Sequence, residues 1–142
     1  MKNTQKIKRV HLKINQNTGT LLFGLVSTEP DYKLSLSLNR KLNISLKQTL
    51  PVSFTEKKQA EIHFSRFTDS SVTGITYDLV SNRSGTIRLI KKLKNIDYFF
   101  HVHNSENEDI TDYLVSLLRD TEYVTAVFIL DPKLMTERNL LF

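Results

Sequence analysis

Apolar and polar residues alternate in several short runs along this chain, a spacing typical of half-buried β-strands. In the first run, residues 8–14, three aliphatic residues alternate with polar ones, and a turn at 15–19 joins it to a more apolar run at 20–28. We therefore predict a hairpin of two strands. Similar runs predict further strands near residues 60–68, 73–81, 95–103 and 123–130.

Two other segments show the spacing of helices. Residues 30–43 follow a helix-start signal, with a proline and acidic residues in the first turn, so a helix is favoured there. The alternation within 32–38 would also suit a strand, and that alternative stays open. Within residues 105–121 apolar residues recur at helical intervals, and Ser105 at the start is a suitable capping residue, so a helix is predicted there.

The order of these elements predicts an α+β fold in a single domain, residues 1–142, with a mixed, mostly antiparallel sheet of five to six strands and two helices packed on one face. The strand–helix–strand run at 95–130 suggests a parallel pair joined by a crossover. Residues 44–60 are interpreted as irregular or a partial strand, because Pro51 interrupts them. The tail, 131–142, ends in apolar residues and is expected to dock on the domain.

Composition narrows the class of protein. With 142 residues, 39% hydrophobic and 25% charged, the chain matches a globular domain large enough to bury a core. The absence of cysteine excludes disulfides, thiolate metal sites and cysteine nucleophiles. No apolar run reaches the length of a signal peptide or a membrane span, so we expect a cytoplasmic protein with no membrane partner.

Charge is unevenly distributed along the chain. Residues 1–95 hold 17 basic and 6 acidic residues, whereas residues 96–142 hold 3 and 9. Such a split often marks either a polyanion-binding face or two oppositely charged surfaces that attract partners, but we favour the interpretation that folding mixes the charges of the two halves. No stacking aromatic accompanies the basic residues outside the apolar stripes. The candidate polyanion or partner surface consists of two clusters: Lys6, Lys8, Arg9 and Lys13, and then Arg88, Lys91, Lys92 and Lys94.

His101 and His103 are two residues apart on a predicted strand and therefore share a face. Two such imidazoles can ligate one zinc ion if a third ligand comes from His11, His63 or Asp97. Nothing in the sequence fixes that ligand, and we favour the interpretation of the pair as partly exposed strand histidines. We therefore predict no metal and no other cofactor.

Residues 89–100, Leu-Ile-Lys-Lys-Leu-Lys-Asn-Ile-Asp-Tyr-Phe-Phe, resemble the signature of the IPExxxVDY family, bacterial proteins without an assigned function. The signature positions are Ile90, Ile96, Asp97 and Tyr98. Lys91 and Lys92 stand where the family has proline and glutamate. Two further stretches, 31–40 and 139–142, are also similar to the family pattern.

Asp97 and Tyr98 could serve as a general acid or base with a phenol nearby. Alternation along a strand instead sends their side chains to opposite faces, which favours structural roles. We expect Tyr98, Phe100 and Val102 to form a core stripe, and Asp97 to accept hydrogen bonds from a neighbouring loop or to pair with a lysine.

No catalytic constellation is visible in the sequence, so we predict that the protein is not an enzyme. The preferred hypothesis is a cytoplasmic protein-binding or scaffold protein of unknown specific role, engaging another protein through an exposed strand edge or charged faces. The alternative is an RNA-associated accessory protein that binds through basic clusters at 2–13 and 88–94.

Overall fold

The computed structural model describes residues 19–55, 61–104 and 110–137, which form a six-stranded sheet, a separate two-stranded hairpin and three helices. The predicted strand at 8–14 and most of its turn lie outside these residues. The elements in chain order are β1 (Thr20–Val26), α1 (Asp31–Leu42), β2 (Lys47–Phe54), β3 (Ile62–Asp69), β4 (Ile75–Ser81), β5 (Arg83–Ser84), β6 (Ile87–Arg88), β7 (Tyr98–Asn104), α2 (Thr111–Arg119), β8 (Ala126–Leu130) and α3 (Lys133–Glu137).

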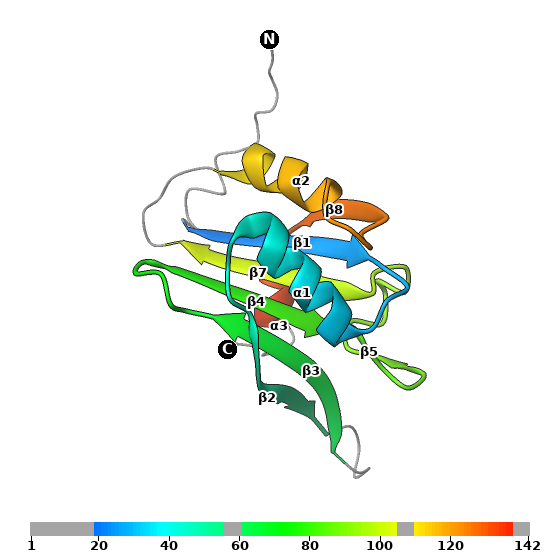
Figure 1. Cartoon of the computed structure of the whole chain (residues 1–142). Helices are drawn as coiled ribbons and strands as arrows, with labels where there is room; N and C mark the ends of the chain where they lie inside the picture. The colour runs from blue at the N-terminus through cyan, green and yellow to red at the C-terminus, as the bar shows by residue number, and fades with distance from the viewer. Residues whose placement is uncertain (1–18, 56–60, 105–109, 138–142) are drawn as a thin grey trace.

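The sheet has the order β2-β3-β4-β7-β1-β8, and every neighbouring pair is antiparallel. Figure 1 shows α1 and α2 lying side by side across one face of this sheet. The predicted α+β class, the strand number and the two helices on one face are therefore confirmed, in a single compact domain. No helix in the part of the chain that the structure describes is both long and apolar enough to cross a membrane.

β1 is an interior strand between β7 and β8. Its run Leu-Leu-Phe-Gly-Leu is almost wholly buried because both faces of the sheet are covered there. The expected direct pairing of strand 95–103 with strand 123–130 is wrong: β7 and β8 point the same way, but β1 separates them and pairs antiparallel with each. The continuous apolar run of β1 fits this interior position, because both of its faces are covered.

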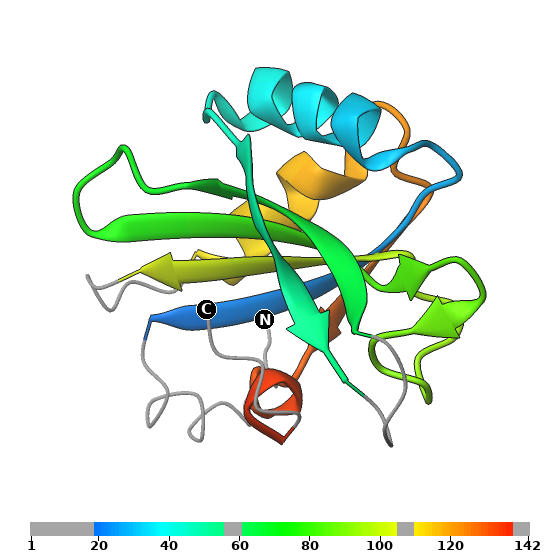
Figure 2. The ribbon, with the colours of Figure 1, turned by 90° about the horizontal axis from the view of Figure 1, so that it is seen from below.

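The two large helices cover the first of two apolar clusters. Leu34 and Leu38 of α1 and Leu114 and Leu118 of α2 are buried against the face of the sheet that carries Phe100. Figure 2 shows both helices on the same side of the sheet, with α3 on the other side. The stripe of apolar residues at helical spacing, detected in the sequence, therefore marks the faces that the helices bury.

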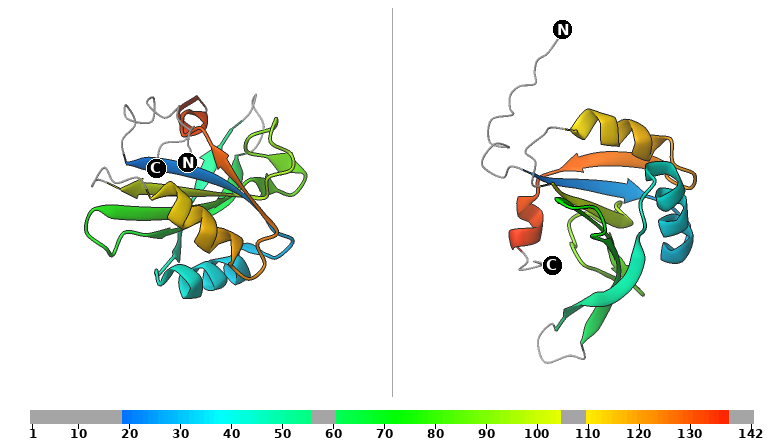
Figure 3. Two further views of the ribbon diagram at one scale, coloured as in Figure 1. Left: turned by 90° about the horizontal axis from the view of Figure 1, so that it is seen from above. Right: turned by 60° about the vertical axis from the view of Figure 1, so that its left-hand side comes forward.

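The second cluster lies on the opposite face, where no long helix is present in the described chain. It is covered by the loop between β4 and β7 and by α3, whose Met135 is 3% exposed (Figure 3). Leu134 of α3 packs against the same cluster. Residues 133–137 of the predicted tail are thus in contact with the domain, whereas 138–142 lie outside the described residues.

For residues 44–60 the alternative of a partial strand is confirmed, since residues 47–54 form β2. Pro51 is tolerated there because it sits on the outermost strand, at a register shift between Thr49 and Val52, where its missing N–H breaks no interior ladder. The second helix begins at Thr111 with Ile110 as its N-cap residue, and Ser105, the predicted capping residue, lies outside the described residues.

Gly24 in β1 allows the loop before β7 to approach the sheet closely. A Cβ atom at this position would lie 2.8 Å from Cδ1 and 3.2 Å from Cγ2 of Ile96, and 3.1 Å from Cδ1 of Leu130. Ordinary carbon contacts are longer, so any larger residue would push the Ile96 side chain away. The signature residue Ile96 is therefore seated over a glycine.

We predict that Gly24→Ala lowers the free energy of unfolding by about 1–3 kcal/mol through overpacking. Because the shortest contact is to Cδ1 of Ile96, which valine lacks, Ile96→Val in the same chain should recover part of the loss. Urea denaturation of the two single variants and the double variant measures this coupling. Strictly additive losses would show that the close approach is not the cause.

Candidate functional site

Asn82, at the end of β4, fixes the loop that carries the basic residues. Its side chain is fully buried, at 0% exposure. The amide donates hydrogen bonds to the carbonyls of Leu93 (3.0 Å) and Ile96 (2.9 Å) and accepts one from the N–H of Ile90 (2.9 Å). Its own carbonyl accepts the N–H of Leu89 at 2.9 Å. One residue therefore satisfies backbone groups along the length of the loop.

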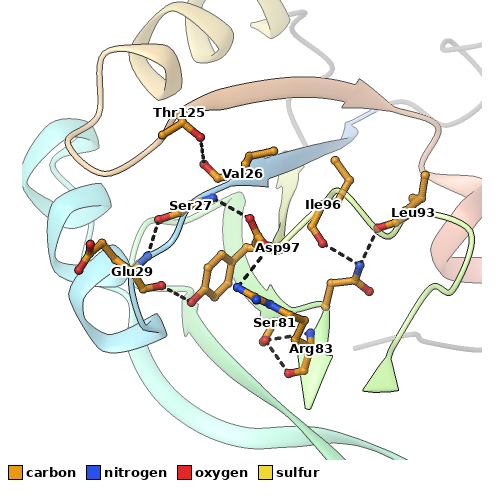
Figure 4. A network of polar contacts seen from close by, with 11 residues as sticks. Val26, Ser27, Glu29, Ser81, Arg83, Leu93, Ile96, Asp97 and Thr125 are labelled. Atoms are coloured by element: carbon orange, nitrogen blue, oxygen red, sulfur yellow. Dashed lines mark hydrogen bonds and ion pairs between the residues drawn. The ribbon is translucent and has the colours of Figure 1, made fainter. Parts of the chain in front are cut away.

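Asp97 closes the loop at its other end. Its carboxylate accepts the N–H of Ser27 at 2.9 Å and lies 3.1 Å from Nη2 of Arg83, as Figure 4 shows. Its backbone N–H donates to the carbonyl of Leu25, and its carbonyl accepts the N–H of Asn82, both at 2.9 Å. The expected hydrogen bonding from a loop is confirmed, but the expected lysine partner is wrong, since the cation is an arginine.

Tyr98 has a structural role as well. Its hydroxyl donates a 2.6 Å hydrogen bond to the carbonyl of Glu29, and its ring is buried in the first apolar cluster with Phe100 and Val102, which confirms the predicted core stripe. Burial, with the negative charge of Asp31 as a smaller cause, raises the pKa of Tyr98 to about 12. At neutral pH the phenol therefore remains a hydrogen-bond donor.

The basic residues of the loop lie at the outer positions of two successive turns. The N–H of Leu93 donates to the carbonyl of Ile90, and the N–H of Ile96 donates to the carbonyl of Leu93, each at 3.1 Å. Ile90, Leu93 and Ile96, which close the two turns, are buried or half-buried. Lys91, Lys92 and Lys94, which lie between them in the sequence, are exposed. Among the remaining residues of the predicted basic surface, Arg88 of β6 is half-buried, and Lys6, Lys8, Arg9 and Lys13 lie outside the described residues.

His101 and His103 share a face of β7, as predicted, with ring centroids 6.4 Å apart. His103 Nδ1 lies 3.3 Å from the Thr20 hydroxyl, and burial lowers the pKa of His101. Asp97, a proposed third ligand, is already bonded to a backbone N–H and an arginine. Within the described ranges no group of three or more His, Asp or Glu side chains is placed to hold a metal ion.

Of the other proposed third ligands, His63 lies on β3 beside Ser53 of β2, and β4 separates β3 from β7. His11 lies outside the described residues. The sequence spacing therefore identified the shared face of the two histidines correctly, while the structure brings no third ligand to them in the part it describes.

The two outer strands of the sheet differ in how they are protected from pairing. β2 has an exposed Lys47, a proline and a register shift, all features that discourage addition of another strand. β8 reads Ala-Val-Phe-Ile-Leu, without charge, proline or a register shift. Phe128 is 47% exposed and Ile129 63% exposed. Among the described strands β8 has β1 as its single neighbour, so its other edge is unpaired.

A shallow polar hollow lies beside the turn between β3 and β4, lined by Lys47, Thr49, Asp69 and Ser71 among others. Asp69 is buried, and its carboxylate accepts the N–H groups of Ser45 and Ser71, both at 2.8 Å, and the hydroxyl of Ser71 at 2.6 Å. These bonds tie the start of β2 to the turn. The role of Asp69 in this hollow is therefore structural.

Sequence reasoning missed the two residues on which these surfaces depend most. The sequence Asn-Arg-Ser-Gly at 82–85 is typical of a turn, and nothing in it marks Asn82 as buried. The exposure of Ile129 was missed because the apolar run of β8 resembles an interior strand. No feature of that run identifies it as an outer strand, since outer strands usually carry a charge or a proline.

Replacing Asn82 by alanine is expected to lower the free energy of unfolding by roughly 2–5 kcal/mol, because three hydrogen bonds are lost and buried backbone groups are left without partners. The exposed Asn95→Ala variant in the same loop is the control, with an expected change within about 0.5 kcal/mol. Urea denaturation compares the two. Similar values for both variants would contradict the anchoring role of Asn82.

The raised pKa of Tyr98 predicts a loss of stability at alkaline pH. The phenol ionises near pH 10 in the unfolded chain and near 12 in the folded protein, so its contribution is present below pH 10 and lost as the pH rises through 12. The free energy of unfolding of Tyr98→Phe should therefore fall less between pH 10 and 12 than that of the unaltered protein. Tyr113→Phe, at an exposed position, is the control. Parallel pH profiles for the unaltered protein and Tyr98→Phe would contradict this assignment.

Neither a protein-family model nor a curated protein matches this chain. The resemblance of residues 89–100 to the IPExxxVDY signature stays a prediction, with Ile90, Ile96, Asp97 and Tyr98 each given structural contacts in the fold. What the protein does must therefore follow from the chemistry of its own surfaces, chiefly the free edge of β8 and the anchored basic loop.

Proposed function

We propose that this protein is a non-catalytic binding protein that receives an extended segment of a partner protein along the free edge of β8. The observation that carries the proposal is the difference between the two outer strands. One edge has a lysine, a proline and a register shift, whereas the other has none of these. An unprotected edge is a template for an added strand, and folded proteins usually avoid leaving one.

Binding of this kind combines two sources of affinity. The outer edge of β8 offers backbone N–H and C=O groups that can pair with an added strand, as in other cases of β-augmentation. Phe128 and Ile129 point to opposite faces of the sheet, because successive strand residues alternate, and both remain substantially exposed. An extended partner segment with apolar side chains on both faces would cover them. The proposed ligand is therefore an apolar, extended peptide segment.

The rest of the domain suits this role. β8 is held by β1, which is buried on both faces, and α2 packs in the cluster next to it (Figure 1). An edge held on a rigid scaffold loses little conformational entropy when a ligand pairs with it. The exposed strand edge, named from the sequence as one of two interaction surfaces, is thus placed at β8 by this proposal.

A lysine at position 129 should block strand addition, since a charged residue on an edge strand must be desolvated when another strand pairs with it. We predict that Ile129→Lys weakens partner capture roughly tenfold or more. Its free energy of unfolding should change by less than about 1 kcal/mol, since the side chain is 63% exposed. Leu50→Lys, on the opposite outer strand and 80% exposed, is the matched control and should leave capture unchanged.

The measurement is affinity capture with purified bait after nuclease treatment, followed by hydrogen exchange of the reconstituted complex. The proposal requires a defined protein partner that is retained after nuclease treatment, lost with Ile129→Lys and kept with Leu50→Lys. It also requires slower exchange of the β8 amides in the complex. Capture that survives Ile129→Lys, or a complex that leaves β8 exchange unchanged, would contradict it. Light scattering identifies the case in which the added strand comes from a second copy of this chain.

A further inference from the structure

One side of α2 carries two opposite charges at its two ends. Leu114 and Leu118 face the sheet and are buried in the first apolar cluster. Asp112 and Arg119 are seven residues apart and therefore share a different side of the helix, with Val115 between them. Both charged residues are exposed, and neither forms an ion pair with another described residue. Their charges are thus available to a second molecule.

This side of α2 is turned toward the free edge of β8. Burial, followed by the nearby groups Asp69 and Tyr113, raises the pKa of Tyr77, so Tyr113 lies on the side of α2 that faces β4. In the sheet, β4 lies inward of β8. At 3.6 residues per turn, Asp112 and Arg119 lie on the other side of the buried stripe from Tyr113. They therefore face outward, and Figure 1 shows α2 on the β8 side of α1.

The two outer strands of the sheet suit a closed pair of molecules. When β8 of one copy pairs with β8 of another, both outer strands of the combined sheet are β2. That strand carries an exposed Lys47, Pro51 and a register shift, which discourage the addition of a further strand. Assembly through β8 therefore stops at two copies and does not continue into a filament.

We propose that the extended segment received by β8 is β8 of a second copy of this chain, paired antiparallel about a two-fold axis perpendicular to the sheet. This inference rests on the proposed binding at the β8 edge and names its partner. Pairing centred at Phe128 places Phe128 of the two copies opposite each other, and Val127 of each copy opposite Ile129 of the other. Because β8 has no charged residue, no like charges face each other across this pairing. The exposed side chains of Phe128 and Ile129 are both covered by it.

The same two-fold axis brings the two α2 helices together. Because the axis is perpendicular to the sheet, both helices lie on one face of the combined sheet and run antiparallel to each other. Asp112 of each copy then lies beside Arg119 of the other, with Val115 of both copies between the two pairs. A surface with opposite charges at its two ends is complementary to itself in this orientation. This complementarity identifies a second copy of the chain as the partner that fits the edge.

Sedimentation equilibrium of the full-length chain over a dilution series tests the proposal. The unaltered protein should have twice the chain mass of 16.5 kDa at high concentration, and this mass should fall on dilution. Ile129→Lys should remain a monomer, since a lysine on the paired edge must be desolvated. Leu50→Lys, at an exposed position on β2, is the matched control and should form the dimer as the unaltered protein does.

Charge reversal on α2 tests the orientation of the two copies. Asp112→Arg and Arg119→Asp, made as separate variants, each place like charges opposite each other at both ends of the paired helices. Each variant alone should therefore raise the Kd of the dimer roughly tenfold. An equimolar mixture of the two variants should recover the unaltered affinity, because opposite charges then face each other again at both ends. Recovery in the mixture also shows that both variants are folded.

Three results would overturn the proposal: a monomer at every concentration, a dimer that survives Ile129→Lys, or a mixture of the two charge variants that binds no more tightly than either variant alone. Slow hydrogen exchange of the β8 amides in such a monomer would mean that another segment of the same chain covers the edge. A monomer that still captures a different protein through β8 would overturn the second copy alone and leave the proposed function standing. Absence of both the dimer and the capture would overturn both.

Discussion

The buried amide of Asn82 is the interaction on which the loop between β4 and β7 depends. A neutral amide can satisfy a donor and two acceptors of the surrounding backbone at once, and it does so without the desolvation cost of a charge. The loop, in turn, covers the second apolar cluster with Leu89, Ile90 and Ile96. One polar side chain thus couples the core on one face of the sheet to the arrangement of charge on the surface above it.

The loop between β4 and β7 and the outer edge of β8 are separate in the fold, but both are connected to β1. β1 contacts the loop through the hydrogen bond from Asp97 to Leu25 and through Gly24, over which Ile96 is seated. On its other edge β1 holds β8, whose outer edge is unpaired among the described strands. β1, which is almost wholly buried, therefore connects the loop to β8 through the interior of the sheet.

Much of the fold could be predicted from the sequence, because the periodicity of apolar residues reports burial directly. The stripe of Tyr98, Phe100 and Val102 follows from such spacing, whereas the helix at Asp31–Leu42 also needed its start signal, because the spacing alone would suit a strand. Strand order cannot be predicted in this way, since periodicity carries no information about which strands are neighbours. The position of β1 between β7 and β8 therefore became apparent only in the structure. The strand around Pro51 could be predicted only as one of two alternatives, because proline is tolerated on an outer strand, a position that only the assembled sheet defines.

The division of the loop into inward and outward positions also explains how its sequence can change. Ile90, Leu93 and Ile96 are constrained by the core, but positions 91 and 92 are the two central residues of a turn and contribute little to it. The IPExxxVDY signature that this segment resembles has proline and glutamate at these two positions, and proline is favoured at the first of them in common turns. Two lysines in place of that pair give this segment positive charge where the signature has a negative one. In such a framework the inward positions set how the loop packs, and the outward positions set its charge.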